Sequence, residues 1–317
     1  MKELDFLKII TDVLDDNSLL GDDCAYLSDL DIFITQDTLV EDVHFSLYTT
    51  SPYLLGRKSV AVNLSDIASS LSMPKYITVS VSLPASIENS FVSEFYRGVN
   101  EICSEYGVKV AGGDITGADK VMISVCAIGK KKINYISSRS FAKKGDIVAV
   151  VGKHGSSAAG LYALSNFLYA DEELINSHIN PKPCLNQSYK LSKIIDENIV
   201  VMDSSDGLID SLYKIASASR HSLEIDINKV PVSEKLIEFS SQNNLDYKDF
   251  VKWGGEDYGL IICLPDKLYS LLNPDEFVAV GKVLNKDISP CVVVKDGSRT
   301  ENITENVFFE KSYNHFS

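Results

Sequence analysis

Apolar residues recur along the chain with two different spacings, and their alternation predicts strands and helices in turn. Residues 76–83 alternate apolar and small polar side chains, which is typical of a half-buried strand. Residues 52–72 place Leu55, Val60 and Leu64 on one side of a helix. Further helices are expected over 88–106, from 155 onward, near 186–196 and at the end of the strand–turn–helix unit 199–219. Further strands are expected at 31–37, 108–111, 121–129, 146–152, 223–228, 259–264, 277–283 and 291–295.

This order of elements predicts an α/β protein with α+β character, built from two parts. The first block predicts an antiparallel or mixed sheet with helices on one face. Charged and small residues cluster at 137–144, where we expect a hinge. Because 317 residues suit two domains of roughly 100–200 residues each, we predict an N-terminal domain over 1–140 and a C-terminal α/β domain over 141–317.

Charge and composition exclude several classes of protein. The chain has 30 Lys+Arg against 44 Asp+Glu and a net charge of −14, which argues against a nucleic-acid binder. No apolar run approaches the roughly 18 residues of a membrane span. Acidic residues within Met1–Asp5 precede no apolar segment, so we expect no secretion leader and a cytoplasmic protein. The six cysteines form no CxxC pair, so we expect reduced thiols and no zinc site.

Aspartates stand beside glycine, serine and apolar strands rather than among lysines and arginines. Glycine permits tight turns and close approach of the backbone to a ligand. The motifs around Asp37 and Asp114 are expected at strand ends. Each motif alone also suits a turn or a helix cap. The motifs are Gly21-Asp22-Asp23, Gln36-Asp37-Thr38, Asn63-Leu64-Ser65-Asp66, Gly112-Gly113-Asp114, Asp203-Ser204-Ser205-Asp206-Gly207 and Gly254-Gly255-Glu256-Asp257.

If these carboxylates converge, they require cations. Two unit charges 4 Å apart repel by about 4 kcal/mol at an effective dielectric near 20. Hard divalent cations prefer oxygen ligands, and Mg²⁺ is held by a few carboxylates together with substrate phosphates. The motifs therefore favour Mg²⁺-dependent phosphate chemistry.

The familiar phosphate-binding signatures are missing from the sequence. It contains no GxxxxGK[ST] loop and no HRD or DFG set, which excludes a Walker-type site and a protein kinase. Gly152-Lys153-His154-Gly155, at a predicted helix start, suits either an anion held by backbone N–H groups or a plain helix entry.

Taken in order, the motifs resemble those of the thiamine-monophosphate kinase family, over essentially the whole chain. The wider superfamily includes aminoimidazole ribonucleotide synthetase, selenophosphate synthetase and a hydrogenase-maturation protein. His44 and the Gly254–Tyr258 run resemble the thiamine branch. The matching runs are Gly21–Ala25, Asp37–Val40 with His44-Phe45, Ala61–Asp66, Gly112–Asp114, Ser156–Leu161, Ser205–Leu208, Gly254–Tyr258 and the closing Tyr313–Phe316.

The resemblance implies the two-domain fold of the aminoimidazole ribonucleotide synthetase-like superfamily. It also implies a reaction in which ATP and thiamine phosphate give ADP and thiamine diphosphate with several Mg²⁺ ions. A homodimer is implied as well, in which the N-terminal sheets of two subunits close a barrel near the ATP. On this basis the N-terminal domain binds ATP and Mg²⁺ and dimerises, and the C-terminal domain completes the active site.

The same resemblance assigns site residues by position. No side chain is assigned as nucleophile or base, since the acceptor is already a phosphate oxyanion, and transfer relies on metal-bound Asp23, Asp66, Asp114 and Asp206. The implied Mg²⁺ ligands are Asp23, Thr35, Gln36, Asp37, Asp66, Asp114, Asp203 and Asp206. The implied nucleotide contacts are Tyr106, Gly113, Asp114, Arg139 and Ser205, and the implied thiamine-phosphate contacts are His44, Glu256 and Tyr313.

Four of these residues have an alternative interpretation. Arg139 suits a bidentate phosphate contact or a solvated hinge arginine, and His44 suits a ligand or a satisfied core or surface histidine. Tyr313 suits stacking on a flat cationic heterocycle or C-terminal packing. Glu256 suits pairing with the thiazolium or aminopyrimidine, or capping of a turn.

The chain departs from the family pattern at three positions. Gln36 stands where threonine is usual, Ser156 replaces an aspartate, and Cys184 replaces the arginine of a Pro-x-Pro-Arg run. Two alternatives to the kinase therefore stay open. One is another ATP-using synthetase of the superfamily, and the other is a nucleotide-binding scaffold without turnover.

Overall fold

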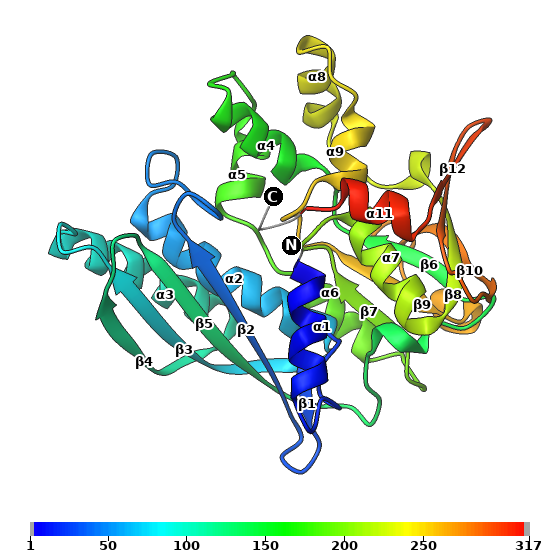
Figure 1. Cartoon of the computed structure of the whole chain (residues 1–317), viewed down its shortest axis with the longest axis horizontal. Helices are drawn as coiled ribbons and strands as arrows, with labels where there is room; N and C mark the ends of the chain where they lie inside the picture. Colours follow the sequence, from blue (N-terminus) through cyan, green and yellow to red (C-terminus); the bar gives the residue numbers. More distant parts are fainter. Residues whose placement is uncertain (1–2, 314–317) are drawn as a thin grey trace.

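The computed structural model describes residues 3–313, so Asn314–Phe316 of the closing motif lie outside the described residues. Within residues 3–313, the strands form two mixed sheets, one from residues 25–130 and the other from residues 147–303 (Figure 1). No helix in this range is long and apolar enough to cross a lipid bilayer.

The first sheet has five strands in the order β1-β2-β5-β3-β4. All neighbours are antiparallel except β3 and β4, which are parallel. Helices α2 (Pro52–Ser69) and α3 (Asn89–Tyr106) cover one face, as predicted (Figure 1). The strands are β1 (Ala25–Leu27), β2 (Ile32–Val40), β3 (Met73–Leu83), β4 (Lys109–Gly117) and β5 (Met122–Lys130).

The second sheet has seven strands in the order β12-β11-β8-β10-β6-β9-β7, with β8 and β11 parallel. Helix α7 (Leu208–Ser219) packs on this sheet, while α6 (Leu185–Ser192) lies toward α2. The strands are β6 (Ile147–Val151), β7 (Val200–Asp203), β8 (His221–Asp226), β9 (Leu260–Leu264), β10 (Val278–Lys286), β11 (Val292–Asp296) and β12 (Arg299–Ile303).

The remaining helices lie around the two sheets. Helices α4, α5, α8 and α9 pack against one another above the second sheet (Figure 1). Their bounds are α4 (Ser156–Ser165), α5 (Glu172–Ile179), α8 (Glu234–Gln242) and α9 (Tyr247–Trp253). The others are α1 (Glu3–Val13), α10 (Asp266–Tyr269), α11 (Glu305–Lys311) and the 3₁₀ turns η1 (Arg139–Phe141) and η2 (Ile227–Lys229).

Helix α2 lies between the two sheets and is the central element of the fold. From Leu55 to Ser69 every residue is buried except Asp66, which is half-buried. A helix buried on all sides needs apolar or small residues around its whole circumference, and the run Ser59–Leu64 provides them. Its neighbours include β2 and β5 on one side and β7 and α6 on the other. Asp66 is therefore the one residue along this stretch whose side chain is not fully covered by its neighbours.

Two expectations about strand ends are wrong. The motifs around Asp37 and Asp114 lie inside β2 and β4, not at their ends. Strand β4 continues to Gly117 because Gly112–Gly117 pair in register with Thr78–Leu83 of β3. Every residue of β4 is exposed, so no apolar run signals its length in the sequence. The short helices α1, α5 and α8–α11 were not predicted either.

Helices α2 and α3 approach closely at two glycines. A Cβ atom on Gly56 would collide with the carbonyl oxygen of Phe95, and one on Gly98 with that of Tyr53. The pair therefore fixes the spacing of the helical layer that carries Asp66.

Gly98→Ala should lower the free energy of unfolding by about 1–3 kcal/mol, because the added methyl forces the two helices apart. Urea denaturation measures this loss. Gly117→Ala is the matched control, since a Cβ there meets nothing within 4 Å. Equal stability of both variants would contradict the close-packing argument.

Candidate metal and phosphate site

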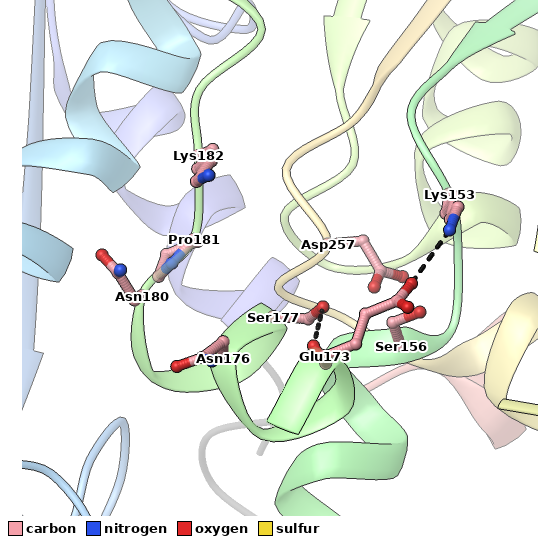
Figure 2. A pocket seen from close by; sticks show the side chains of 9 residues that line it. All are labelled: Lys153, Ser156, Glu173, Asn176, Ser177, Asn180, Pro181, Lys182 and Asp257. Atoms are coloured by element: carbon pink, nitrogen blue, oxygen red, sulfur yellow. Dashed lines mark hydrogen bonds and ion pairs between the residues drawn. The ribbon is translucent and has the colours of Figure 1, made fainter. Parts of the chain in front are cut away.

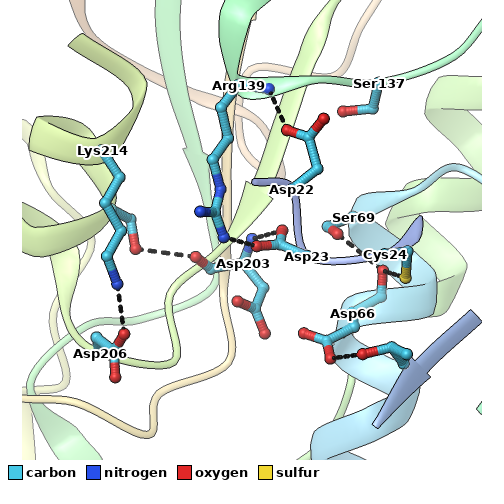
Figure 3. Close-up of polar contacts among 12 residues, drawn as sticks. Asp22, Asp23, Cys24, Asp66, Ser69, Ser137, Arg139, Asp203, Asp206 and Lys214 are labelled. Carbon is cyan, nitrogen blue, oxygen red and sulfur yellow. Dashed lines mark hydrogen bonds and ion pairs between the residues drawn. The ribbon is translucent and has the colours of Figure 1, made fainter. Parts of the chain in front are cut away.

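Three carboxylates from distant parts of the chain meet in one place. Asp23 precedes β1, Asp66 lies on α2, and Asp203 ends β7. One oxygen of each lies within 4.8 Å of the others (Figure 3). The sequence-based prediction that scattered aspartates converge is therefore confirmed for these three residues.

Local hydrogen bonds hold two of these carboxylates in place. The Thr35 hydroxyl donates to Asp66 Oδ2 at 2.6 Å, which ties β2 to α2. The Cys24 thiol donates to the Asp66 carbonyl at 3.2 Å. The backbone N–H of Asp203 donates to Asp23 Oδ2 at 3.3 Å, so the end of β7 is joined to the segment before β1.

Proximity and burial disfavour the charged forms of these acids. Burial, followed by the charge of Asp23, raises the pKa of Asp203 to about 8. Burial, with Asp206 and Asp23 nearby, raises the pKa of Asp37 to about 6. Burial and the charges of Asp37 and Asp203 also raise the pKa of Asp66. Ionisation of all these acids would give the site more negative charge than its own groups neutralise.

Two basic side chains supply part of the missing positive charge. The Arg139 guanidinium pairs with Asp23, and its backbone N–H donates to Asp22 Oδ1 at 2.8 Å (Figure 3). Lys214 Nζ lies 2.6 Å from both Asp206 Oδ2 and Asp210 Oδ1. Arg139 thus contacts an acid of the site, which disfavours its interpretation as a solvated hinge residue.

The donor set fits a hard divalent cation. Both carboxylate oxygens of Asp203 are buried and find no hydrogen-bond partner among the residues that the structure describes. Buried anionic oxygens without partners are costly, and a cation satisfies them. The ligands gathered here are oxygens alone, as Mg²⁺ prefers.

The other predicted ligands lie at different distances from the three-carboxylate group. Asp37 is on β2 and its N–H donates to Asn63 Oδ1 at 3.0 Å, which directs this strand toward α2. Gln36, its neighbour, is exposed on the opposite side of the strand and donates to Ser124. Asp114 and Gly113 are exposed on β4, outside the group.

The predicted substrate contacts fall into two places. Glu256 Oε1 pairs with Lys58 Nζ at 2.9 Å, and Oε2 lies 3.1 Å from His178 Nδ1. Although burial opposes the charged form, Lys58 and His178 lower the pKa of Glu256 to about 2. The carbonyl oxygen of His44 accepts from the same lysine at 3.3 Å. Tyr313 is 58% exposed, near the end of the described chain.

The backbone around Glu256 is tightly constrained. Glu256 has φ 63°, a left-handed value that residues other than glycine rarely adopt. Its N–H donates to the Ser205 carbonyl at 2.6 Å. A Cβ on Gly255 would lie 2.7 Å from that same carbonyl oxygen, so only glycine fits before Glu256. Ser205, a predicted nucleotide contact, therefore also holds this segment.

A pocket of about 470 Å³ lies beside this segment, and Asp257 is one of its lining residues (Figure 2). Asp257 accepts from the N–H groups of Gly155 at 2.6 Å and Ser157 at 3.0 Å. Burial, opposed by these N–H groups, raises its pKa to about 7. The start of α4 is thus capped by an acid of the chain itself, which favours the plain helix entry over an anion site.

Two further positions singled out in the sequence are half-buried. The Cys184 thiol, where the family pattern has arginine, donates to the Tyr258 carbonyl at 3.6 Å. Tyr106 ends α3, and burial raises its pKa to about 12.

Comparisons with known proteins identify the family of the chain. The model for "AIR synthase related protein, N-terminal domain" matches residues 21–130. The chain is 33% identical over 313 residues to thiamine-monophosphate kinase of Bacillus subtilis, covering 94% of this chain and 93% of the relative. The chain belongs to the thiamine-monophosphate kinase family. The same enzyme of Buchnera aphidicola subsp. Acyrthosiphon pisum is 34% identical, covering 94% and 92%.

Solved structures of this kinase family have the same fold. The complex "AaThiL complexed with AMPPCP and TMP" is 29% identical with a TM-score of 0.84, covering 96% of this chain and 97% of that chain. The chain is therefore an enzyme, a kinase with the aminoimidazole ribonucleotide synthetase-like α/β fold.

The family motifs give no indication of three side chains that shape the site: Lys58, His178 and Lys214. One of them had a signal in the sequence. Arg57-Lys58 stands inside the predicted helix 52–72, directly before an apolar run. Charges on a helix that is apolar elsewhere must find partners when the helix is buried. His178 and Lys214 lie on α5 and α7, and no comparable pattern marks them.

Without divalent cations, the melting temperature should fall as pH rises from about 5 to about 9. In the folded state the pKa of Asp37 is raised to about 6 and that of Asp203 to about 8. The contribution of these acids to the free energy of unfolding is therefore complete below the pKa that they have in the unfolded chain, and it is lost as pH rises through their folded-state pKa values. Thermal melts in EDTA measure the slope. Asp203→Asn should flatten the part between about pH 6 and about pH 8, where Asp37 is already ionised, whereas Asp119→Asn, at an exposed position, should leave it unchanged. A melting temperature that rises over this range would contradict the assignment.

Proposed function

We propose that this chain transfers the terminal phosphoryl group of ATP to thiamine phosphate, giving ADP and thiamine diphosphate. The observation that carries the proposal is the convergence of Asp23, Asp66 and Asp203 within 4.8 Å. Family membership supports it, and so does the likeness to a relative solved with AMPPCP and TMP.

The cluster is suited to bringing two anions together. Asp23, Asp66 and Asp203 would hold Mg²⁺, with Thr35, Asp37, Asp114 and Asp206 as further ligands around the nucleotide phosphates. When bound, the ions neutralise phosphate charge and stabilise charge that develops during transfer. The acceptor phosphate is already ionised, so no side chain needs to remove a proton from it.

The chain's own residues align the reactants. Arg139, largely buried beside Asp23, is poised for an ionic contact with the nucleotide phosphates. Ser205 and Gly113 would contact the nucleotide, with Tyr106 as a further candidate. Gln36 is the weakest of the proposed Mg²⁺ ligands, because its side chain faces away from the cluster.

His44, Glu256 and Tyr313 would bind thiamine phosphate. Glu256 is held as an anion by Lys58 and His178, which supports a fixed hydrogen-bond acceptor rather than a free counter-ion for the thiazolium. Tyr313, whose side chain is 58% exposed, would stack on the heterocycle.

The active form would be a homodimer joined through the first sheet, with domains 1–140 and 141–317 in each subunit. The support is an exposed edge strand, β4, together with exposed apolar side chains on the same sheet. Unpaired edges and apolar patches of this kind are normally covered. The exposed apolar residues are Met73, Tyr76, Val110, Ile115 and Met122.

Incubation with Mg-ATP and thiamine phosphate should yield ADP and thiamine diphosphate in equal amounts, and thiamine should not be phosphorylated. Chromatography of the thiamine species together with an ADP assay measures both products. Nucleotide binding without transfer would favour the scaffold alternative. ADP release with other acceptors alone would favour a synthetase of the superfamily.

Mg²⁺ with a non-hydrolysable ATP analogue should raise the melting temperature of the wild type, because ligands that bind only the folded state stabilise it. Asp66→Asn should remove most of this gain by taking one charge from the cluster. Asp275→Asn, at an exposed loop position, is the control and should keep the full gain. An undiminished gain in Asp66→Asn would exclude this residue from the metal site.

A further inference from the structure

One buried ammonium group contacts two of the residues proposed to bind thiamine phosphate. Lys58 is 1% exposed, in the middle of α2. Its Nζ lies 2.9 Å from Glu256 Oε1 and 3.3 Å from the carbonyl oxygen of His44. His44 follows β2 in the first half of the chain, and Glu256 precedes β9 in the second half.

The burial of this ion pair is not explained by stability. Removing two charges from water costs several kcal/mol per ion, and replacing a buried pair by apolar residues is often neutral or stabilising. Apart from Arg57, the helix around Lys58 is packed with small and apolar side chains such as Val60 and Ala61. A lysine at this position is therefore better explained by its effect on the positions of the groups that it contacts.

Glu256 depends on this lysine for its position. Its backbone is fixed by the left-handed φ and by the hydrogen bond to the Ser205 carbonyl. The side-chain torsions of Glu256 are then set by its two partners. Lys58 contacts one carboxylate oxygen and His178 contacts the other. His178 is itself buried and lies 3.3 Å from the Ser157 hydroxyl, so the far side of the carboxylate is also anchored.

We propose that Lys58 is the positioning residue of the thiamine-phosphate half of the site, holding the Glu256 carboxylate and the His44 carbonyl at one fixed separation. The inference rests on the proposed function, because it takes His44 and Glu256 as substrate contacts. Lys58 acts through these two residues and sets how well the acceptor is held, whereas the nucleotide half is built from other groups.

Arg57 supplies a matched comparison on the same helix. It is nearly as buried, at 8% exposed, and also forms ion pairs, but its partners are Glu101 and Glu105 of α3 and the side chain of Asn180. A change at Arg57 removes a buried cation from α2 without touching Glu256 or His44.

Lys58→Met should raise the KM for thiamine phosphate about tenfold or more, the loss expected for one charge-assisted contact, with the KM for ATP within about twofold of wild type. Lys58→Arg, which keeps the charge and can still donate to both oxygens, should restore part of the affinity. Arg57→Met should lower the melting temperature and leave the KM for thiamine phosphate unchanged. The rise in melting temperature with Mg²⁺ and the ATP analogue confirms that each variant is folded with its nucleotide half intact.

The outcomes separate this inference from the proposed function. An active wild type with an unchanged thiamine-phosphate KM in Lys58→Met overturns the inference alone, as does an equal rise in the KM for ATP. A folded wild type that does not phosphorylate thiamine phosphate overturns both. Should Lys58→Met fail to fold, Lys58→Gln, which keeps a donor and most of the volume, is held to the same criterion.

Discussion

The site depends on carboxylates being held closer together than their charges favour. Asp23, Asp66 and Asp203 repel one another, and the fold must supply the force that keeps them in place. That force comes from packing, because α2 is buried between two sheets and β7 contacts it from the second sheet. Without cations the acids retain protons instead, as the raised pKa values of Asp203 and Asp66 indicate. Protons and the proposed metal ions would therefore compete for the same oxygens.

Much of this arrangement was predictable from the sequence. Alternation over residues 76–83 and the helical pattern over 52–72 located β3 and α2 within a few residues. The placement of aspartates beside glycine and serine indicated convergence, and three of them do converge. These predictions worked because each depends on a local pattern that tertiary structure reinforces.

Other features depend on contacts that no local pattern encodes. The length of β4 follows from its register with β3, and its exposed glycines and polar residues give no strand signal. Gln36 faces away from the cluster because side chains alternate along β2, so its neighbours Thr35 and Asp37 face inward. Lys58 pairs with Glu256, which lies far away along the chain, and Lys214 pairs with Asp210, one helical turn away. Only the fold reveals that these lysines neutralise these acids.

The cap on α4 has a consequence for how the charge of the nucleotide phosphates can be balanced. In many phosphate-binding proteins the N-terminus of a helix points at the ligand, and its exposed N–H groups carry a partial positive charge that binds the phosphate. Here Asp257 already occupies the amides of Gly155 and Ser157, so α4 has no such end to offer. If the chain acts as proposed, the charge of the triphosphate would be balanced by divalent ions and by side chains such as Arg139. In the proposed reaction, binding of the nucleotide would therefore depend on bound divalent ions rather than on the start of this helix.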